Sequence, residues 1–134
     1  KVDDNRVYNE ILKFGFVKYI SPKPKEELLN IYRKNHIFVM PSVAETFGLV
    51  YPEAMSQGLP VIYTRGQGFD GQFKEGQVGY SVDCFDAGEI ADSIIKITND
   101  YENISKRCIE LSSIYNWEEI ARKHKDIYTK IRQE

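Results

Sequence analysis

Short apolar runs alternate with segments of helical periodicity along most of the chain. Residues 36–40, 60–63 and 79–82 are brief runs rich in apolar and β-branched side chains. A continuous run of this length is typical of a strand buried on both faces of a parallel sheet. Residues 14–20 are aromatic and β-branched, and they predict a further strand.

Helices are expected between these strands. Pro24, followed by two glutamates, predicts the first turn of one helix. A second helix should run to about Gln57, with Gly58 in the left-handed position that often ends helices. Because proline fits best in a first turn, Pro52 predicts that the regular part of this helix begins only near Tyr51.

The last third of the chain is predicted to be helical, because apolar residues recur there every three or four positions. Three helical faces are defined by Ile90, Ile94 and Ile97, by Tyr101, Ile104, Cys108, Leu111 and Tyr115, and by Trp117, Ile120, Ala121, His124, Ile127, Tyr128 and Ile131. Trp117, the tyrosines and His124 are therefore expected in the core. Residues 65–79, with five glycines, predict a long loop, and residues 1–13 a frayed helix or an arm.

Strands that alternate with helices indicate an α/β fold with a parallel sheet and right-handed crossovers. Such sheets bind ligands at the carboxyl ends of their strands. Residues 21–25, 42–47 and 64–71 are the loops expected to leave those ends, and the middle loop contains Glu45.

Composition narrows the class of protein without choosing a function. The 134 residues fit one domain, and a net charge of −2 gives no positive field for nucleic acid. Cys84 and Cys108 form no CxxC pair, which argues against a disulfide scaffold and a metal site and favours a reducing, cytoplasmic setting. No apolar run is long enough to cross a membrane, and the first residues do not resemble a signal peptide.

The strongest chemical signal is a pair of carboxylates, Glu45 and Glu53, around the turn Phe47-Gly48. Backbone N–H groups in such a turn favour anions or hydroxyl oxygens, and a glycine lets a ligand approach the backbone closely. A carboxylate accepts charge-assisted hydrogen bonds of about 1.5–3 kcal/mol each, and a second one at this spacing suits the vicinal diol of a ribose. The alternative is that both are solvated acids near the start of a helix.

The order of these features resembles the carboxyl-terminal domain of the retaining GT-B glycosyltransferases of family 4, the glycosyl transferases group 1. The family's signature is two glutamates separated by seven residues, here Glu45 and Glu53. Further matching segments are Leu29-Asn-Ile-Tyr32, Gly76-Gln-Val-Gly79-Tyr-Ser-Val82 and Asn116-Trp117-Glu118-Glu119-Ile120-Ala121. The resemblance covers about residues 14–132.

This resemblance implies an incomplete Rossmann-like domain, a parallel sheet flanked by helices that is one half of a GT-B fold. Glu45, the expected catalytic residue, would contact hydroxyls of the transferred sugar. The backbone of Phe47, Gly48 and Leu49 would face the sugar and the donor diphosphate, and Glu53 would hold the ribose hydroxyls. Family members typically need no metal or other cofactor, because basic side chains and backbone amides stabilise the leaving diphosphate.

The chain departs from the family pattern in three places. The family's basic diphosphate-binding residues lie upstream of the segments found here, so residues 1–134 are expected to be a single-domain, carboxyl-terminal fragment. The loop that often reads Gly-Gly-x-x-Glu is different, and Arg65 or Asp70 could serve the donor there or simply shape the turn. His36 replaces a common Asp and is expected at a strand edge, without a catalytic role.

The expected function of the complete protein is transfer of a sugar from a nucleotide-sugar donor to an acceptor glycan or lipid-linked sugar, in glycan or cell-envelope (capsular) polysaccharide synthesis. The expected location is cytoplasmic or peripheral at the membrane. The fragment is expected to be inactive by itself, and its exposed sheet edge or apolar surface to favour self-association. Two alternatives are half of a GT-B nucleotide-sugar epimerase or phosphorylase, and a non-catalytic interaction domain.

Overall fold

A three-stranded parallel sheet forms the centre of the computed structural model, which describes residues 5–132; residues 1–4 of the predicted amino-terminal arm lie outside the described residues. The strands are β1 (Phe38–Val39), β2 (Val61–Thr64) and β3 (Gly79–Val82), in the order β1-β2-β3. Val61 pairs with Phe38 on one side and with Gly79 on the other, and all four residues of β2 are buried. The predicted α/β fold with a parallel sheet is confirmed.

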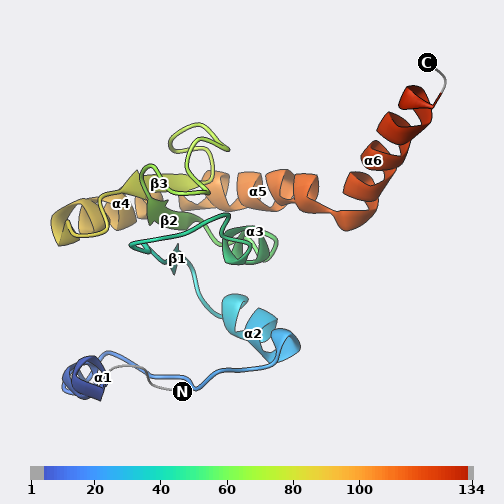
Figure 1. Cartoon of the computed structure of the whole chain (residues 1–134). Coiled ribbons are helices and arrows are strands. Elements are labelled where there is room, and N and C mark those ends of the chain that lie inside the picture. Colours follow the sequence, from blue (N-terminus) through green and yellow to red (C-terminus); the bar gives the residue numbers. More distant parts are fainter. Residues whose placement is uncertain (1–4, 133–134) are drawn as a thin grey trace.

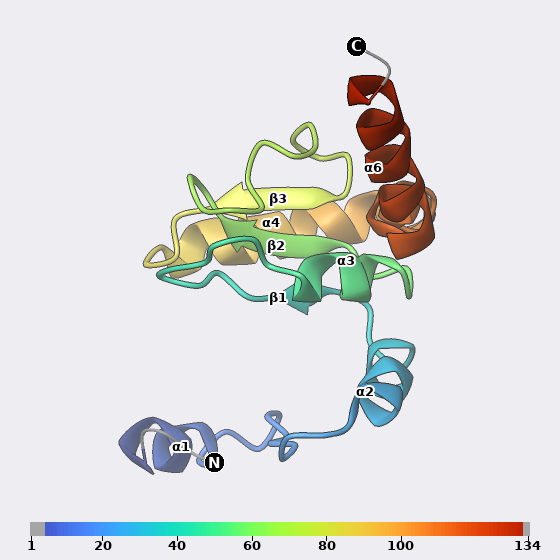
Figure 2. The ribbon, with the colours of Figure 1, turned by 45° about the vertical axis from the view of Figure 1, so that its right-hand side comes forward.

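Helices lie before, between and after these strands along the chain. They are α1 (Asn5–Ile11), α2 (Lys25–Tyr32), α3 (Val50–Met55), α4 (Ala87–Asn99), α5 (Tyr101–Ser112) and α6 (Trp117–Ile131), with a short 3₁₀ turn, η1 (Ser113–Tyr115), before α6. In Figures 1 and 2, α4 lies behind the sheet, α3 lies beside β2, and α6 leaves the body of the molecule at an angle. None of the described helices has the length and apolar character needed to cross a membrane.

Pro52 and Gly58 mark the two ends of helix α3. It starts at Val50, one residue before the predicted start, so Pro52 lies in the first turn, where its missing N–H costs nothing. It ends at Met55, earlier than predicted. The amide of Gly58 donates to the Met55 carbonyl at 2.8 Å, and Gly58 has a φ of 84°, which confirms its left-handed conformation.

The predicted strand over residues 14–20 is wrong. This segment turns on itself, with the Val17 amide donating to the Phe14 carbonyl at 3.0 Å, and the side chain of Phe16 is 87% exposed. A strand needs a neighbouring strand to bond, and no described strand lies beside this segment in either view (Figures 1 and 2). Residues 21–25 were expected to leave the carboxyl end of that strand. Because the strand does not form, this expectation is wrong as well.

Strand β1 is shorter and more exposed than predicted. Among the described residues it pairs only with β2, and Val39 is 41% exposed, so the prediction of a strand buried on both faces is wrong. The ring of Phe38 packs on the other face, against Tyr32 and Tyr51, at centroid distances of 5.6 and 5.8 Å. His36 lies outside the strand, with its ring 5.7 Å from that of Tyr101.

Three aromatic rings hold the loop after β2 to the sheet. The ring of Phe69 lies 4.7 Å from Tyr51 and 4.9 Å from Tyr63, and all three side chains are at most 2% exposed. The tyrosine hydroxyl of Tyr51 donates to the Met40 carbonyl at 2.6 Å. Residues 65–78 form the loop predicted over 65–79, since Gly79 already belongs to β3. Phe69 anchors this loop in the core, which the glycine content alone did not indicate.

Helix α6 forms as predicted but packs differently. None of its described residues is buried, and Trp117 is 73% exposed, so the prediction that Trp117 and His124 lie in the core is wrong. Nδ1 of His124 lies 2.8 Å from the carbonyl oxygen of Ile120, within its own helix. The apolar face of α6 is real, but no described element covers it (Figure 1).

Candidate functional site

The loops that follow β1 and β2 are held together at the carboxyl ends of these strands. The Glu45 amide donates to the side-chain oxygen of Gln67 at 3.0 Å, and the Gly68 amide donates to the Glu45 carbonyl at 3.1 Å. The hydroxyl of Thr64 donates to the Ser42 carbonyl at 2.6 Å. The structure thus places Glu45 where two neighbouring loops meet, at the edge of the sheet where ligands of open α/β folds bind.

The approach of these loops depends on Gly68. A Cβ atom at this position would lie 1.8 Å from the backbone oxygen of Thr46, which is far inside any allowed contact. Neither atom belongs to a flexible side chain, so a larger residue must move one of the two loops. The spacing of the two loops, and with it the position of Glu45, is therefore set by a glycine.

The carboxylate of Glu45 closes its own turn. Its Oε1 accepts hydrogen bonds from the amides of Gly48 at 3.0 Å and Phe47 at 3.4 Å. Gly48 has a φ of 76°, and a Cβ there would lie 2.4 Å from the ring of Tyr51, so glycine alone fits. Among residues 5–132, Oε2 of Glu45 accepts no hydrogen bond, and the amide of Leu49 donates none. These two groups of the turn are available to a ligand.

A neutral tyrosine lies close to each of the two glutamates. Burial raises the pKa of Tyr51, and the negative charge of Glu45 raises it further. Burial and the charge of Glu53 act in the same way on the pKa of Tyr32. Both phenols therefore stay protonated at neutral pH, so the two glutamates carry the negative charge of this region.

Glu53 lies in the first turn of α3 and forms an ion pair with Lys25, with 3.0 Å between Oε1 and Nζ. Both side chains line a cavity of about 490 Å³ between α3 and the junction of α5 with α6. The remaining lining residues are Leu49, Pro52, Ser56, Ser112, Ser113, Tyr115, Asn116 and Trp117. We call this space the Glu53 cavity. The sequence singled out Glu53 and Leu49 but gave no signal for Lys25, and it assigned Trp117 to the core.

Tyr115 connects the Glu45 turn with the Glu53 cavity. Its ring packs edge-on against that of Phe47, with centroids 6.2 Å apart, and its hydroxyl donates to the side-chain oxygen of Gln72. Leu49 belongs to the turn and also lines the cavity. The structure thus brings the predicted residues Glu45, Phe47, Gly48, Leu49 and Glu53 into one region, and adds a wall from the end of α5.

Arg65 and Asp70 are engaged within the protein. Arg65 forms an ion pair with Glu89, and its guanidinium donates to the Ser81 carbonyl at 3.3 Å. Asp70 accepts hydrogen bonds from the amides of Gly66 at 2.7 Å and Gly71 at 3.0 Å, as turn-forming aspartates do. These contacts explain both residues structurally, and their role toward a ligand stays a prediction.

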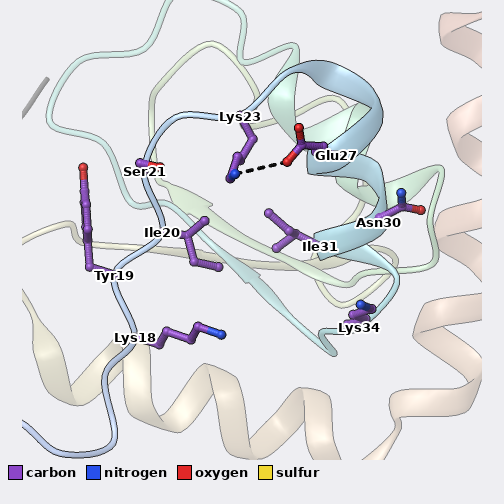
Figure 3. A pocket seen from close by; sticks show the side chains of 9 residues that line it. All are labelled: Lys18, Tyr19, Ile20, Ser21, Lys23, Glu27, Asn30, Ile31 and Lys34. Carbon is purple, nitrogen blue, oxygen red and sulfur yellow. Dashed lines mark ion pairs between the residues drawn. The ribbon is translucent and has the colours of Figure 1, made fainter.

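A second cavity, of about 440 Å³, lies between residues 18–23 and α2 (Figure 3). Lys18, Lys23 and Lys34 line it, and Lys23 pairs with Glu27 at 3.1 Å. Figure 3 shows Ile20 and Ile31 pointing toward one another across its middle. The cavity shares no lining residue with the Glu53 cavity, so we keep the two separate.

Within residues 5–132, no group of three or more His, Cys, Asp or Glu side chains is placed to hold a metal ion. Cys108 is buried, its thiol lies 3.3 Å from the Val78 carbonyl, and burial raises its pKa to about 12. The thiol therefore stays protonated at neutral pH, and a protonated thiol is a poor metal ligand.

Comparison with known proteins identifies relatives of one kind. Residues 2–113 match the family described as glycosyl transferases group 1. The chain is 33% identical over 115 residues to the D-inositol 3-phosphate glycosyltransferase of Corynebacterium urealyticum, covering 84% of this chain and 27% of the relative. It is 36% identical over 115 residues to the sulfoquinovosyl transferase SQD2 of Arabidopsis thaliana, covering 81% of this chain and 21% of that protein.

Solved structures agree with these matches. The sucrose-phosphate synthase of Thermosynechococcus elongatus superposes with a TM-score of 0.81 at 27% identity, over 96% of this chain and 34% of that one. The pneumococcal O-GlcNAc transferase GtfA, in complex with UDP and GlcNAc, gives a TM-score of 0.71 at 24% identity, over 99% of this chain and 28% of that one, which shows a common fold. The chain spans about a quarter of the length of the curated relatives named above.

Proposed function

The chain belongs to the glycosyl transferases group 1, and from this premise we propose that it forms the donor-binding part of an enzyme that transfers a sugar from a nucleotide sugar to an acceptor. Its fold is the Rossmann-like half of a GT-B fold, with a parallel sheet flanked by helices. The observation that carries the proposal is the joining of the Glu45 turn to the Glu53 cavity at one end of this sheet.

Each group in this region has a proposed role toward the donor. Oε2 of Glu45 accepts a hydrogen bond from a hydroxyl of the transferred sugar. The backbone of Phe47, Gly48 and Leu49 faces the sugar and the diphosphate. Glu53 exchanges its ion pair with Lys25 for the two hydroxyls of the ribose. The match to this family supports retention of the anomeric configuration and stabilisation of the leaving diphosphate by amides and basic side chains, without a metal ion.

The acceptor and the biological process extend the same proposal. The printed names of the relatives include an inositol phosphate and a sulfoquinovosyl group, so members of the family use different substrates. We place this protein in glycan or cell-envelope polysaccharide synthesis, in the cytoplasm or at the membrane surface. The acceptor is contacted by residues beyond this chain, and the 134 residues alone bind a donor without completing the transfer.

A panel of nucleotide sugars, each with and without acceptor, tests the proposed reaction in the natural gene product that contains this chain. Transfer of the sugar to the acceptor is the expected result. Conversion of the donor sugar without any acceptor would show an epimerase instead. Neither turnover nor donor binding with any member of the panel would contradict the enzyme proposal and favour an interaction domain.

Replacing Glu53 with Gln is expected to raise the KM for the nucleotide sugar roughly 10- to 100-fold, because a charge-assisted hydrogen bond to the ribose is lost. Steady-state kinetics with varied donor concentration measures this change, and kcat should change much less. Glu102→Gln is the matched control, since Glu102 is an exposed carboxylate of α5 outside the Glu53 cavity. An unchanged donor KM in Glu53→Gln would contradict the proposed binding of the ribose by Glu53.

We also propose that the isolated chain associates with itself, because several exposed apolar side chains have no cover among the described residues. Phe16 is 87% exposed, and Ile127 and Ile131 on α6 are more than half exposed. Light scattering at rising protein concentration should show a mass above that of one chain, and Phe16→Ser together with Ile127→Ser should reduce it. A strictly monomeric mass at high concentration contradicts the proposal.

A further inference from the structure

We propose that Gln67 is a positioning residue for Glu45, because its side chain fixes the backbone from which the Glu45 carboxylate reaches the transferred sugar. This inference rests on the proposed function, since Gln67 has this task only if Glu45 acts on a sugar. Gln67 lies in the loop after β2, where the chain departs from the family pattern. The family motifs described above therefore give this residue no role.

Both backbone polar groups of Glu45 are bound by two consecutive residues of the other loop. The Glu45 amide donates to Oε1 of Gln67 at 3.0 Å, and the Glu45 carbonyl accepts from the Gly68 amide at 3.1 Å. Within residues 5–132, no group other than Gln67 accepts a hydrogen bond from the Glu45 amide. The Glu45 backbone cannot rotate without breaking one of these two bonds, so its direction is set by the loop after β2.

The backbone of Gln67 is itself held firmly. Its amide donates to the Thr64 carbonyl at 3.3 Å, and its carbonyl accepts from the Asp70 amide at 2.8 Å. Phe69, two residues further on, is 2% exposed and anchors the same loop in the core. The side-chain oxygen of Gln67 therefore extends from a fixed point, as a group that positions another residue must do.

The Glu45 carboxylate depends on this bond although it does not touch Gln67. Oε1 of Glu45 is bound by the amides of Gly48 and Phe47, which follow Glu45 in the same turn. The turn can therefore tilt as a unit about Glu45, its first residue, with its own hydrogen bonds intact. Loss of the Gln67 bond permits that tilt and moves Oε2 away from the sugar, and a displacement of about 1 Å can cost roughly 100-fold in rate.

A direct contact between Gln67 and a ligand is the competing explanation. Gln67 lines a cavity of about 470 Å³ together with Val43 and Phe85, and its Nε2 donates no hydrogen bond among the described residues. The geometry favours positioning, because the bond from the Glu45 amide to Oε1 fixes the orientation of the whole side-chain amide. The variants below distinguish the two explanations.

Gln67→Met in the natural gene product removes the acceptor at nearly constant length and volume, since a thioether accepts hydrogen bonds only weakly. We expect kcat for sugar transfer to fall roughly 5- to 100-fold, with a donor KM within about threefold of the parent value. Gln77→Met is the matched control, because Oε1 of Gln77 also accepts from a backbone amide, that of Lys74 at 3.2 Å, in the loop before β3. The control should keep the kcat of the parent enzyme.

A double variant shows whether Gln67 acts through Glu45. In Glu45→Gln the charge that Gln67 positions is already lost, so adding Gln67→Met should leave kcat within about threefold of the Glu45→Gln value. The full loss of Gln67→Met, repeated in the Glu45→Gln background, would show that Gln67 acts on the ligand directly. That outcome would overturn positioning.

Amide hydrogen exchange in the 134-residue chain, followed by NMR, tests the contact without any assay of activity. In Gln67→Met the Glu45 amide should exchange roughly 2- to 10-fold faster, the change that loss of one hydrogen bond implies. The amides of β2 and β3 should keep their exchange rates. An equal acceleration of all these amides would show a general loss of stability and would overturn the specific role of Gln67.

Failure of this inference can be told from failure of the proposed function. Sugar transfer with an unchanged kcat in Gln67→Met would overturn positioning and leave the proposed function standing. Normal turnover in Glu45→Gln would also overturn it, since no catalytic carboxylate would remain to be positioned. If the parent enzyme neither binds nor transfers any nucleotide sugar of the panel, the donor-binding proposal and this inference fail together.

Discussion

Replacing Glu45 with Gln is expected to lower the kcat for sugar transfer by roughly 100- to 1,000-fold, the usual loss when one preorganised electrostatic contact to a transition state is removed. Glutamine still offers an oxygen to the amides of Gly48 and Phe47, so the turn should stay closed. What the variant lacks is the negative charge beside the transferred sugar. Steady-state assays of the enzyme that contains this chain, at saturating donor and acceptor, measure the effect.

Glu45→Ala separates the two tasks of this side chain. It removes both the charge and the acceptor of the turn, so it should lose stability as well as activity, whereas Glu45→Gln should lose activity alone. Glu110→Gln on α5 serves as the matched control, because Glu110 is an exposed carboxylate remote from the Glu45 turn in sequence. Normal turnover in Glu45→Gln would show that Glu45 only closes its turn and has no part in catalysis.

Replacing Gly68 with Ala is the second change with a large expected effect. The added Cβ would lie 1.8 Å from the backbone oxygen of Thr46, so one loop must move away from the other. That movement breaks the hydrogen bond from the Gly68 amide to the Glu45 carbonyl and disturbs the packing beside Phe69. We expect the free energy of unfolding to fall by about 2–3 kcal/mol, at the upper end for overpacking, and donor binding to weaken with it.

Urea denaturation followed by circular dichroism measures the loss in Gly68→Ala. Gly15→Ala is the control, because nothing lies within 4 Å of a Cβ at Gly15 and its φ is outside the left-handed region. That change should alter the free energy of unfolding by less than about 0.5 kcal/mol, as surface substitutions usually do. A stability of Gly68→Ala equal to that of Gly15→Ala would contradict the close approach of the two loops.

The sequence predicted those elements whose pattern is local. Strands β2 and β3 were identified from continuous apolar runs, and the three last helices from spacing, because both signals depend only on neighbouring residues. The left-handed Gly58 and the late start of α3 around Pro52 were also predictable, since backbone geometry restricts these residue types. The family and the pair Glu45 and Glu53 came from the order of motifs.

The remaining features depend on partners that a sequence pattern does not reveal. Residues 14–20 have the composition of a strand, but a strand also needs a neighbour to bond. The periodicity of α6 predicts an apolar face but not what covers it. Contacts over long sequence separations, such as Lys25 with Glu53 and Phe47 with Tyr115, require the fold itself. The roles of the site residues toward a donor therefore stay predictions to be tested by the variants above.

Helix α6 is attached to the body of the protein at its capped end, Asn116, and extends away from it. None of the 15 residues of this helix is buried, and Asn116, in an extended conformation, joins it to the 3₁₀ turn after α5. At 1.5 Å per residue its arm is about 22 Å long, so a rotation of about 10° at Asn116 would carry its far end roughly 4 Å. Trp117 would move very little, because it is the residue next to Asn116, the point of rotation. A small change of angle at Asn116 would therefore displace Ile131 much farther than the residues that line the Glu53 cavity.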